Sequence, residues 1–482
     1  MQPVLTPEEM GAADRRAIAA GTPVEVLMDR AGRAVAWSIR RRLARAAGLR
    51  VVIACGKGNN GGDGLITARV LRGWGARVDV VRVGEGADGD ALRRMVARAD
   101  VVVDAMYGTG FRGALTDDAL AVCDAFAAFA GPVIAVDIPS GVDGLTGEVR
   151  GTAVRADATV VFAAAKPGLL FEPGRTYAGA VDVVDIGIAV DDGDGASRTF
   201  LTEPEDVAGW VFPRDPAAHK WSSGVFVVGG SDGMTGAPML TSHAAMRAGA
   251  GIVWCGVPGA DAAAAAAGTE VITKALAADT HGALATDAAD AVLADVGRFR
   301  ALAVGPGLGR SEGTAAAVRR LVAEVAGPIV VDADALHALV GHLDVVRARP
   351  VPAVLTPHAG EYAALHGSPP DSDRVAAARA LAATTGAVVL LKGPGTVVAD
   401  PGGRAAICPL GGPWLASAGT GDVLTGIVAA FLARGVEPFA AAAAAAFVHG
   451  SAADRAGHTG LVAGDLVGAL PATLEALAAE RG

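Results

Sequence analysis

The sequence predicts an α/β protein of two domains, in which short apolar strands alternate with helices. The chain has 482 residues, more than a single hydrophobic core usually serves. Hydrophobic residues make up 52% of it and aromatic residues only 4%, which suits closely packed layers of Ala, Val and Leu. Valine-rich runs recur with helix-length segments between them, and this is the pattern of a doubly wound parallel sheet.

The first half is expected to begin with a helix. Thr6-Pro-Glu-Glu9 places Thr at an N-cap, Pro at the first helical position and Glu three residues after the cap. Buried parallel strands are predicted at residues 51–55, 78–83, 101–105, 133–137 and 158–164, with helices such as 65–74 and 91–98 between them. The polar, acidic segment from Val190 to Ser197 predicts a linker, so we expect domains at residues 1–195 and 196–482.

A second series of strands and helices follows the predicted linker. Its strands are expected at residues 225–229, 252–256, 301–305, 329–332, 353–356 and 388–392. The alanine run at residues 440–446 predicts a tightly packed helix, because alanine combines high helix propensity with little hydrophobic area.

Charge and cysteine content exclude several classes of partner. The net charge of -10 argues against a nucleic-acid or anionic-membrane surface, which would require clustered Lys and Arg. No segment approaches the roughly 18 apolar residues of a membrane span, and the N-terminus lacks a signal-peptide pattern. The 4 cysteines form no C-x-x-C pair, so neither a zinc site nor a disulfide framework is indicated. We expect a cytoplasmic protein that acts on small molecules, and a homo-oligomer.

The first glycine-rich loop has the context of a dinucleotide-binding site. Gly56, Gly58 and Gly61 satisfy G-x-G-x-x-G after a predicted strand and before a predicted helix. A glycine-rich turn without a ligand is the alternative. Asn59, Asn60 and Asp63 in the same turn favour a binding site, because a turn alone does not need three polar side chains.

Two acids stand at the ends of predicted strands, Asp104 and Asp137. The carboxyl ends of parallel strands line the ligand crevice, so both should converge on the loop after Cys55 and supply a base. Helix N-capping is the alternative for either acid alone. With Ser140 and Asn60 they offer hard oxygen ligands that would suit a hard cation.

The second glycine-rich loop, Gly419-Thr-Gly-Asp422, precedes a segment with apolar residues at helical spacing. Backbone amides at such a helix start can form an anion hole, and Asp422 could accept a proton from a hydroxyl that attacks a phosphoryl group. A plain capped helix is the alternative, but it would not need Gly on both sides of Thr420.

Further loops of the second half suit a nucleotide. Lys392-Gly-Pro-Gly-Thr396 carries glycines and a cation after a strand, and Gly305-Pro-Gly-Leu-Gly309 permits close approach of a ligand. Asp332 and Asp334 could organise magnesium or a nearby loop, with helix capping as an equal alternative. His358 alone is more typical of a structural hydrogen bond.

The first half resembles the epimerase domain of bifunctional NAD(P)H-hydrate repair enzymes in the runs GNNGGDG, DAMYGTGFRG, VDIPSGVDGLTG and AAAKPG. The resemblance implies a Rossmann-like fold, Asp137 at the reacting ring, and potassium at Asn60, Asp104 and Ser140. It assigns substrate binding to Asn59, Asn60, Gly61, Gly62, Asp63, Gly108, Thr109, Gly110, Phe111, Arg112, Gly113, Ala114 and Asp137. Lys166 is a further candidate for balancing the negative charge near the reacting ring, although a lysine after a strand is more often a solvated surface residue.

The second half resembles the ribokinase-like dehydratase domain of the same enzymes through the GPGLG, TPH, KGPGT and GTGDVLTG segments. The resemblance implies that Ala237, Gly307, His358 and Asp422 contact the hydrated nicotinamide nucleotide. It assigns Lys392, Gly393, Pro394, Gly395, Thr396 and Gly421 to the adenine nucleotide. Ala359, Ala364, Thr269 and Ala418 depart from residues common in the family.

The resemblance implies two reactions. The first domain would interconvert the epimers of the hydrated cofactors, and the second would dehydrate the S epimer to NADH or NADPH while ADP, bound with Mg²⁺, becomes AMP and phosphate. Two alternatives remain: an NAD-dependent dehydrogenase, or a vitamin-type hydroxyl kinase whose first half is a non-catalytic binding module. The dehydrogenase leaves Asn59, Asn60 and the GTGD loop without a role, and a non-catalytic module would be expected to lose Asp137.

Overall fold

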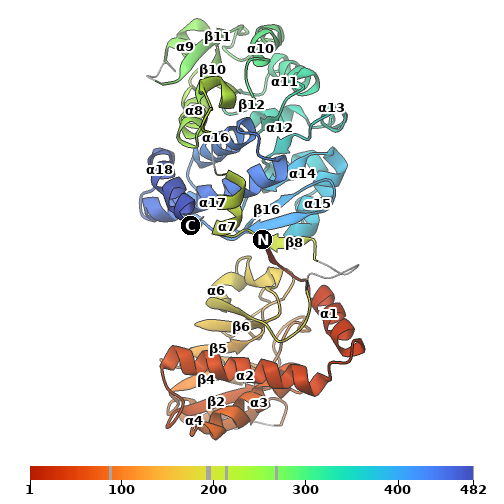
Figure 1. The fold of residues 1–482 in the computed structure, drawn as a ribbon, viewed down its shortest axis with the longest axis vertical. Helices are drawn as coiled ribbons and strands as arrows, with labels where there is room; N and C mark the ends of the chain where they lie inside the picture. Colours follow the sequence, from red (N-terminus) through yellow and green to blue (C-terminus); the bar gives the residue numbers. More distant parts are fainter. Residues whose placement is uncertain (86–88, 191–196, 212–214, 266–269, 481–482) are drawn as a thin grey trace. The chain divides into compact units, whose positions relative to one another are not determined.

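The computed structural model describes residues 1–85, 89–190, 197–211, 215–265 and 270–480. These residues divide into two compact units (Figure 1). The first unit comprises residues 2–199, and the second unit comprises Met1 with residues 200–482. Most of the linker predicted at 190–197, with the boundary near 195, lies outside the described residues and stays a prediction.

The first unit is built on a parallel sheet. Its strands lie in the order β3-β2-β4-β5-β6-β7, and every neighbouring pair is parallel. The strands of this sheet are β2 (Arg50–Cys55), β3 (Arg77–Arg82), β4 (Val101–Ala105), β5 (Val133–Val136), β6 (Ala158–Phe162) and β7 (Ala180–Val184), and the short strand β1 (Gln2–Pro3) is not part of it. The helices are α1 (Pro7–Ala19), α2 (Val24–Leu43), α3 (Asn59–Gly73), α4 (Gly89–Val96), α5 (Asp117–Ala127), η1 (Pro167–Leu169) and α6 (Gly174–Ala178).

Helices cover both faces of this sheet, which confirms the doubly wound prediction. Val51 and Ile53 of β2 pack with α2 and α3, whereas Val52 and Ala54 of the same strand pack with α4 and α5 (Figure 1). Alternate side chains of a strand point to opposite faces, so a strand that is apolar throughout is buried on both.

The predicted capping box of the first helix is present. Thr6 Oγ1 accepts a hydrogen bond from the Glu9 backbone N–H at 3.2 Å, and Glu9 Oε2 accepts one from the Thr6 N–H at 2.7 Å. The helix expected at 65–74 begins earlier, because Gly58 serves as N-cap and Asn59 starts α3. The asparagines therefore lie in the first turn of a helix and not in a free loop.

The second unit has a larger mixed sheet. Neighbouring strands in this sheet lie in the order β17-β16-β15-β14-β13-β12-β9-β10-β11. The bounds are β8 (Thr199–Leu201), β9 (Gly224–Val228), β10 (Ile252–Pro258), β11 (Ile272–Leu276), β12 (Ala301–Val304), β13 (Ile329–Val331), β14 (Val354–Leu355), β15 (Val388–Leu391), β16 (Thr396–Ala399) and β17 (Ala405–Cys408).

The helices of the second unit are α7 (Pro204–Val211), η3 (Lys220–Ser223), α8 (Gly236–Arg247), α9 (Ala260–Ala265), α10 (Ala288–Val296), α11 (Glu312–Glu324), α12 (Asp334–Ala338), α13 (Asp344–Arg347), α14 (Ala359–His366), α15 (Arg374–Thr385), η4 (Pro413–Leu415), α16 (Thr420–Ala433), α17 (Pro438–Ala456) and α18 (Ala463–Ala479). The alanine run lies in α17, where Ala441 to Ala445 are at most 1% exposed, as a tightly packed helix requires.

Four strands of the second unit were not predicted: β8, β11, β16 and β17. β16 pairs antiparallel with both β15 and β17. The Lys392 loop is therefore the turn of a hairpin, because Leu391 pairs with Val397. The 3₁₀ turn η4, and not a strand, lies just before the Gly419 loop, so that loop is a helix start but not a strand-to-helix turn.

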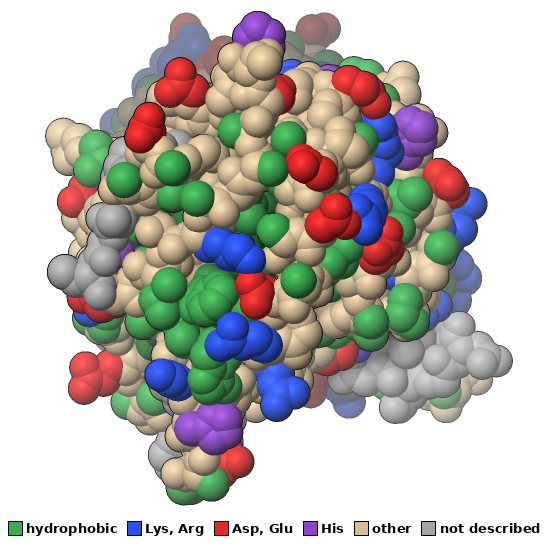
Figure 2. Space-filling view, turned by 90° about the horizontal axis from the view of Figure 1, so that it is seen from above, with side chains coloured by type: hydrophobic (Ala, Val, Ile, Leu, Met, Phe, Trp, Pro, Cys, Tyr) green, Lys and Arg blue, Asp and Glu red, His purple; other side chains and the backbone are tan. Residues whose placement is uncertain are grey.

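The surface carries mixed charge. In the face drawn in Figure 2, Lys and Arg side chains lie among Asp and Glu side chains and beside a small hydrophobic patch. This agrees with the acidic composition, whose net charge is -10. Within the described ranges, no helix is long and apolar enough to cross a membrane.

Candidate active sites

A cavity of about 580 Å³ opens at the carboxyl ends of the strands in the first unit. Its walls come from α1, α2, the start of α3, the segment after β4, and residues just beyond β5, β6 and β7. Of the residues predicted to bind substrate, those that line it are Asn59, Asn60, Asp63, Gly108, Thr109, Gly110, Phe111 and Asp137. Gly61, Gly62, Arg112, Gly113 and Ala114 are not among the described lining residues.

Two glycines allow the loops to meet at this cavity. A Cβ atom on Gly56 would lie 1.9 Å from the Met106 carbonyl oxygen, and one on Gly61 would lie 2.0 Å from the Gly56 carbonyl oxygen. Both contacts involve backbone, so larger residues cannot be accommodated by rotating a side chain. A Cβ on Gly108 would lie 3.3 Å from Asn60 Cγ and 3.4 Å from Asp137 Oδ2, so the structure brings these predicted residues together.

Asp137 forms a buried ion pair with Lys166. Lys166 Nζ donates hydrogen bonds to Asp137 Oδ1 at 2.7 Å and to the Phe162 carbonyl at 2.8 Å, and the Lys166 side chain is 0% exposed. The sequence interpretation of Lys166 as a solvated surface residue was therefore wrong. Asp137 also has φ 66°, a strained conformation for a residue with a side chain.

The proposed cation ligands lie at the same end of the sheet. Asp104 is fully buried, accepts hydrogen bonds from the Ser140 N–H and Oγ, both at 2.7 Å, and has its pKa raised by burial to about 6. Asn60 Oδ1 and Nδ2 are buried and have no hydrogen-bond partner among the described residues. The oxygen atoms of these three side chains are of the kind that a hard cation prefers, and the Asn60 amide is free to bind one.

Two further carboxyl groups line the cavity. Burial raises the pKa of Asp63 to about 8, and the charges of Asp137 and Asp14 add to that effect. Asp14, on α1, also has a raised pKa, caused first by burial. The sequence reading did not single out Asp14, because its position inside a helix carries no strand-end or loop signal.

The second site is centred on Asp422, in the first turn of α16. Burial, followed by the charge of Asp332, raises the pKa of Asp422 to about 7. Gly419 precedes it with φ 90°, a conformation that glycine adopts without strain. On α8, the Thr241 hydroxyl donates to the Asp422 carbonyl at 3.0 Å.

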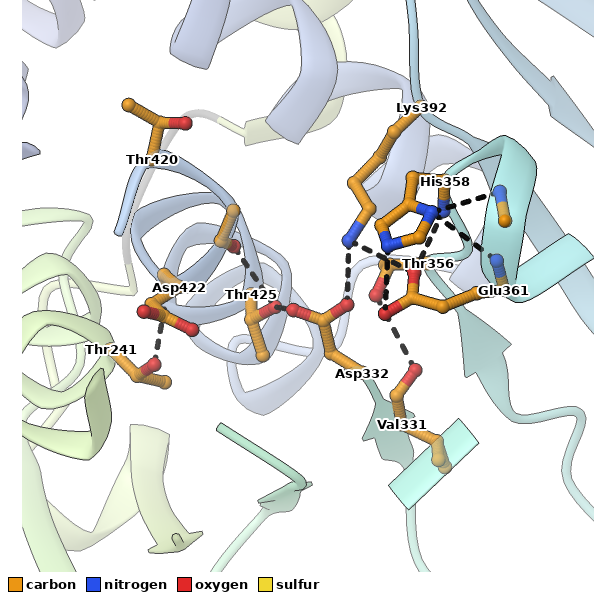
Figure 3. A network of polar contacts seen from close by, with 12 residues as sticks. Thr241, Val331, Asp332, Thr356, His358, Glu361, Lys392, Thr420, Asp422 and Thr425 are labelled. Carbon is orange, nitrogen blue, oxygen red and sulfur yellow. Dashed lines mark hydrogen bonds and ion pairs between the residues drawn. The ribbon is translucent and has the colours of Figure 1, made fainter. Parts of the chain in front are cut away.

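Asp332 connects this helix to the Lys392 loop (Figure 3). Its Oδ1 accepts from Lys392 Nζ at 2.8 Å, and its Oδ2 accepts from Thr425 Oγ1 at 2.6 Å. Burial alone would raise the pKa of Asp332, but Lys392 and Thr425 hold it below its usual value. Asp332 therefore stays ionised beside Asp422 and disfavours a second negative charge there.

Asp334 organises the glycine loop. Its Oδ2 accepts from the Gly309 N–H at 2.9 Å, and its Oδ1 accepts from Arg310 at 2.9 Å. The Ser231 hydroxyl donates to the Gly307 carbonyl at 2.9 Å, and a Cβ on Gly307 would lie 3.3 Å from Ala237 Cβ. Of the two roles considered for Asp334, these contacts favour the organisation of a loop.

His358 caps α14. Its Nδ1 accepts from the Gly360 and Glu361 N–H groups at 3.0 and 3.2 Å, so a neutral ring carries its proton on Nε2. Glu361 Oε2 lies 3.6 Å from Lys392 Nζ, which links His358 to the Asp332 network (Figure 3). Gly421 also adjoins this group, since a Cβ there would lie 3.7 Å from Lys392 Nζ.

A buried histidine that the sequence did not indicate supports the start of α16. His449 Nε2 lies 2.9 Å from the Thr420 carbonyl oxygen. Burial lowers the pKa of His449 to about 4, so the ring is neutral at physiological pH and donates to that carbonyl. Of the residues predicted for the second site, Lys392 and His358 are joined through Glu361 to Asp332.

Two protein families match the chain. The family described as NAD(P)H-hydrate dehydratase matches residues 225–472. The family described as YjeF-related protein N-terminus matches residues 24–95 and 82–168. Each match lies within one of the two units.

Similar proteins match over nearly their whole length. The chain is 40% identical to the bifunctional NAD(P)H-hydrate repair enzyme Nnr of Moorella thermoacetica, an alignment that covers 99% of this chain and 97% of that one. It is 41% identical to the protein of the same name from Salinibacter ruber, with 97% and 95% covered. A third such protein, from Mycobacterium tuberculosis H37Rv, is 41% identical, with 88% of each covered.

Solved structures resemble the second unit. The ADP/ATP-dependent NAD(P)H-hydrate dehydratase of Bacillus subtilis, co-crystallised with ATP and Mg²⁺, is 30% identical and superposes with a TM-score of 0.50, covering 58% of this chain and 98% of that one. A ribokinase-like superfamily protein of Enterococcus faecalis, 20% identical, also has a TM-score of 0.50 and covers 58% and 97%, which shows the fold.

Proposed function

The chain belongs to the bifunctional NAD(P)H-hydrate repair enzymes, and from this premise we infer that it restores hydrated nicotinamide cofactors in two steps. It epimerises R- and S-NAD(P)HX and dehydrates the S epimer to NADH or NADPH. We propose that residues 1–195 carry the epimerase and residues 196–482 the dehydratase. The comparisons do not favour the dehydrogenase or the vitamin-type kinase.

In the epimerase, we propose that Asp137 works on the hydroxylated carbon of the ring. Its Oδ1 is held by Lys166, and its Oδ2 is the oxygen next to Gly108 at the cavity. The hydrogen bond from Lys166 orients the carboxylate, so Asp137 can accept a proton from an oxygen on the ring. The segments 59–63 and 108–114 would bind the rest of the substrate, with the glycines allowing close approach.

We propose that Asn60, Asp104 and Ser140 hold potassium. The unpartnered amide of Asn60 supports this, because a bound cation would satisfy its oxygen. Potassium at this position would supply a fixed positive charge beside the substrate.

In the dehydratase, we propose that Asp422 is the general base. It accepts the proton of the ring hydroxyl, whose oxygen then takes the terminal phosphoryl group of ADP, leaving AMP. The lone pair of the ring nitrogen expels phosphate and a ring proton is lost, which restores the dihydronicotinamide. Phosphorylation is needed because hydroxide is a poor leaving group and phosphate a good one.

Amides and cations are positioned to balance the phosphoryl charge. The first N–H groups of α16 have no side-chain cap and are available to bind an anion. We propose that Lys392, Gly393, Pro394, Gly395, Thr396 and Gly421 bind the nucleotide and that Ala237, Gly307 and His358 contact the hydrate. Mg²⁺ bound with the nucleotide would neutralise its phosphate charge.

The observation that carries the proposal is the presence of two acid sites in separate units: Asp137 with Lys166 in one, and Asp422 with Asp332 and Lys392 in the other. The test incubates the protein with the mixed epimers of NADH hydrate, adding ADP or ATP separately, and follows reduced-cofactor absorbance. Full recovery is expected. Recovery of only the S fraction would show dehydration without epimerisation, and no recovery would refute the dehydration.

Assembly and location remain predictions. We propose a homo-oligomer, which light scattering coupled to gel filtration would test, and a cytoplasmic location.

A further inference from the structure

Asp14 is an acid in the first-unit cavity to which no role has been given. It projects from α1 and lines the same cavity as Asp63, Asp137 and Lys166. Its carboxylate has no hydrogen-bond or ion-pair partner among the described residues, whereas Asp137 is bonded to Lys166. A partly buried, unpartnered carboxyl group does not stabilise the fold, so its position calls for another explanation.

The charges around Asp14 come from several elements. Asp63 of α3, Asp137 beyond β5 and Lys166 beyond β6 share the cavity, and Arg15 is its neighbour on α1. Burial raises the pKa of Asp14 first, Lys166 lowers it and Asp137 raises it. Three carboxyl groups thus face a single buried ammonium, which already pairs with Asp137, so the site holds a proton more readily than isolated acids would.

Epimerisation of the hydrate requires proton transfer at two oxygens. The ring nitrogen's lone pair expels the hydroxyl, which takes a proton and leaves as water, and an iminium ion forms. A second water adds to the same carbon from the other ring face and loses a proton. The number of protons balances if one acid gives a proton on the first face and one carboxylate takes a proton on the second.

We propose that Asp14 is the second acid–base group of the epimerase, serving one ring face while Asp137 serves the other. This rests on the proposed epimerase function. Asp14 and Asp137 enter the cavity from different walls, a surface helix and a strand end, so a flat ring can lie between them. Asp14 gives a proton to the departing oxygen in one direction and takes one from water in the other.

The test compares the full-length protein with the variants D14N, D14E and E8Q, starting from purified R epimer without nucleotide, and measures the S epimer by chromatography. D14N removes the acid–base group but keeps its shape, so kcat should fall by about 10²-fold or more, with KM changed only a few fold. The pH profile of the epimerisation rate of D14N should lack the limb that arises from titration of Asp14. D14E should retain part of the activity, and E8Q, an exposed acid on the same helix, should match the parent.

The second activity of the chain separates the possible failures. Dehydration of the S epimer with ADP should be unchanged in D14N, and its thermal midpoint should not fall. If the parent does not epimerise, the proposed function fails. If the parent epimerises and D14N does so within twofold, the role of Asp14 is refuted. It is also refuted if D14N loses both activity and thermal stability and D14E restores neither.

Oxygen labelling tests the chemical step. In H₂¹⁸O the inverted epimer should carry one solvent oxygen, because the departing and entering waters lie on different ring faces. Retention of the original oxygen would overturn the proposed departure of the hydroxyl.

Discussion

Lys166 is a fully buried lysine, and its ammonium group fixes the carboxylate of Asp137 at the cavity. A buried ion pair contributes little net stability, because desolvation offsets the attraction between the charges. Removal of one partner is different, since the other charge stays buried and uncompensated. The same two residues therefore affect both the stability of the fold and the proposed reaction.

Replacement of Asp137 by Asn should lower the rate of epimerisation by about 10²- to 10⁴-fold, the usual contribution of an acid–base group. It should also destabilise the protein by about 3–5 kcal/mol, because Lys166 loses its counter-ion. The rate is measured from purified R epimer and the stability by denaturant unfolding. The double variant D137N/K166M is the control: it should regain stability but not activity. Restored epimerisation would contradict the role of Asp137.

Asp422 should impose a pH dependence on dehydration. Its pKa is about 7 in the folded protein, and only the ionised form can act as a base. kcat/KM for the S epimer should therefore rise as pH increases through about 7, and D422N should lose about 10²- to 10⁴-fold of it at pH 8. The measurement is a pH series at fixed ionic strength, and a profile that is flat between pH 5 and 9 would contradict it.

The same shift predicts a change in stability. Because the folded pKa of Asp422 lies above the ordinary value of 3.8, the native state binds this proton more tightly and loses stability as pH rises from about 4 to 7. D422N lacks this loss and should be more stable than the parent at pH 8. Equal free energies of unfolding for the parent and D422N at pH 8 would contradict the raised pKa of Asp422.

The sequence was informative for residues that follow strands. Asp104, Asp137 and Asn60 were predicted because a parallel sheet gathers its carboxyl ends, and the structure places Asn60 and Asp137 at one cavity. Lys166 was misjudged, because the sequence does not show that the segment after β6 turns back under the cavity. Asp14 and His449 lie within helices, where a polar residue carries no signal of what it faces.

At the scale of elements, α8 and α16 pack unusually closely. A Cβ on Gly426 of α16 would lie 2.2 Å from the Thr241 carbonyl oxygen and 2.8 Å from Ala244 Cβ. The contact places the Thr241 hydroxyl against the first turn of α16, next to Asp422. Close helix packing therefore sets the position of the proposed base.

G426A should force these helices apart. We expect a loss of about 1–3 kcal/mol of stability from overpacking, together with reduced dehydration because the Asp422 turn moves. G468A is the matched control: Gly468 lies inside α18, has no atom within 4 Å of a new Cβ and should gain about 0.5–1 kcal/mol. Chemical denaturation of both variants measures the difference. Equal changes in the free energy of unfolding for G426A and G468A would show that G426A acts through helix propensity alone and not through overpacking.

Elements with strong patterns were predictable, and those fixed by tertiary pairing were not. The valine-rich strands and the capped α1 agree with the prediction to within a few residues. The hairpin of β15 and β16 was not predicted. Its turn is the glycine-rich Lys392 loop, and such a sequence is equally typical of a hairpin turn and of a ligand-binding loop. β7 was not predicted, and its side chains are exposed or only partly buried.

At the scale of the whole molecule, we propose that the two activities belong to the two units of the chain. A protein with D137N should recover only the S fraction of a mixed hydrate sample, and one with D422N should recover nothing. Mixed in one solution, the two variants should recover the full amount, because the released epimers diffuse between molecules. Absorbance at the end point measures this. Failure of the mixture to exceed D137N alone would contradict independent activities.

All four cysteines, Cys55, Cys123, Cys255 and Cys408, lie in the interior. Burial raises the pKa of Cys55 and of Cys255 to about 11, so these sulfur atoms stay protonated in a cell and react slowly with electrophiles. Oxidants and electrophiles in the surrounding solution therefore find no exposed thiolate on this protein at these positions.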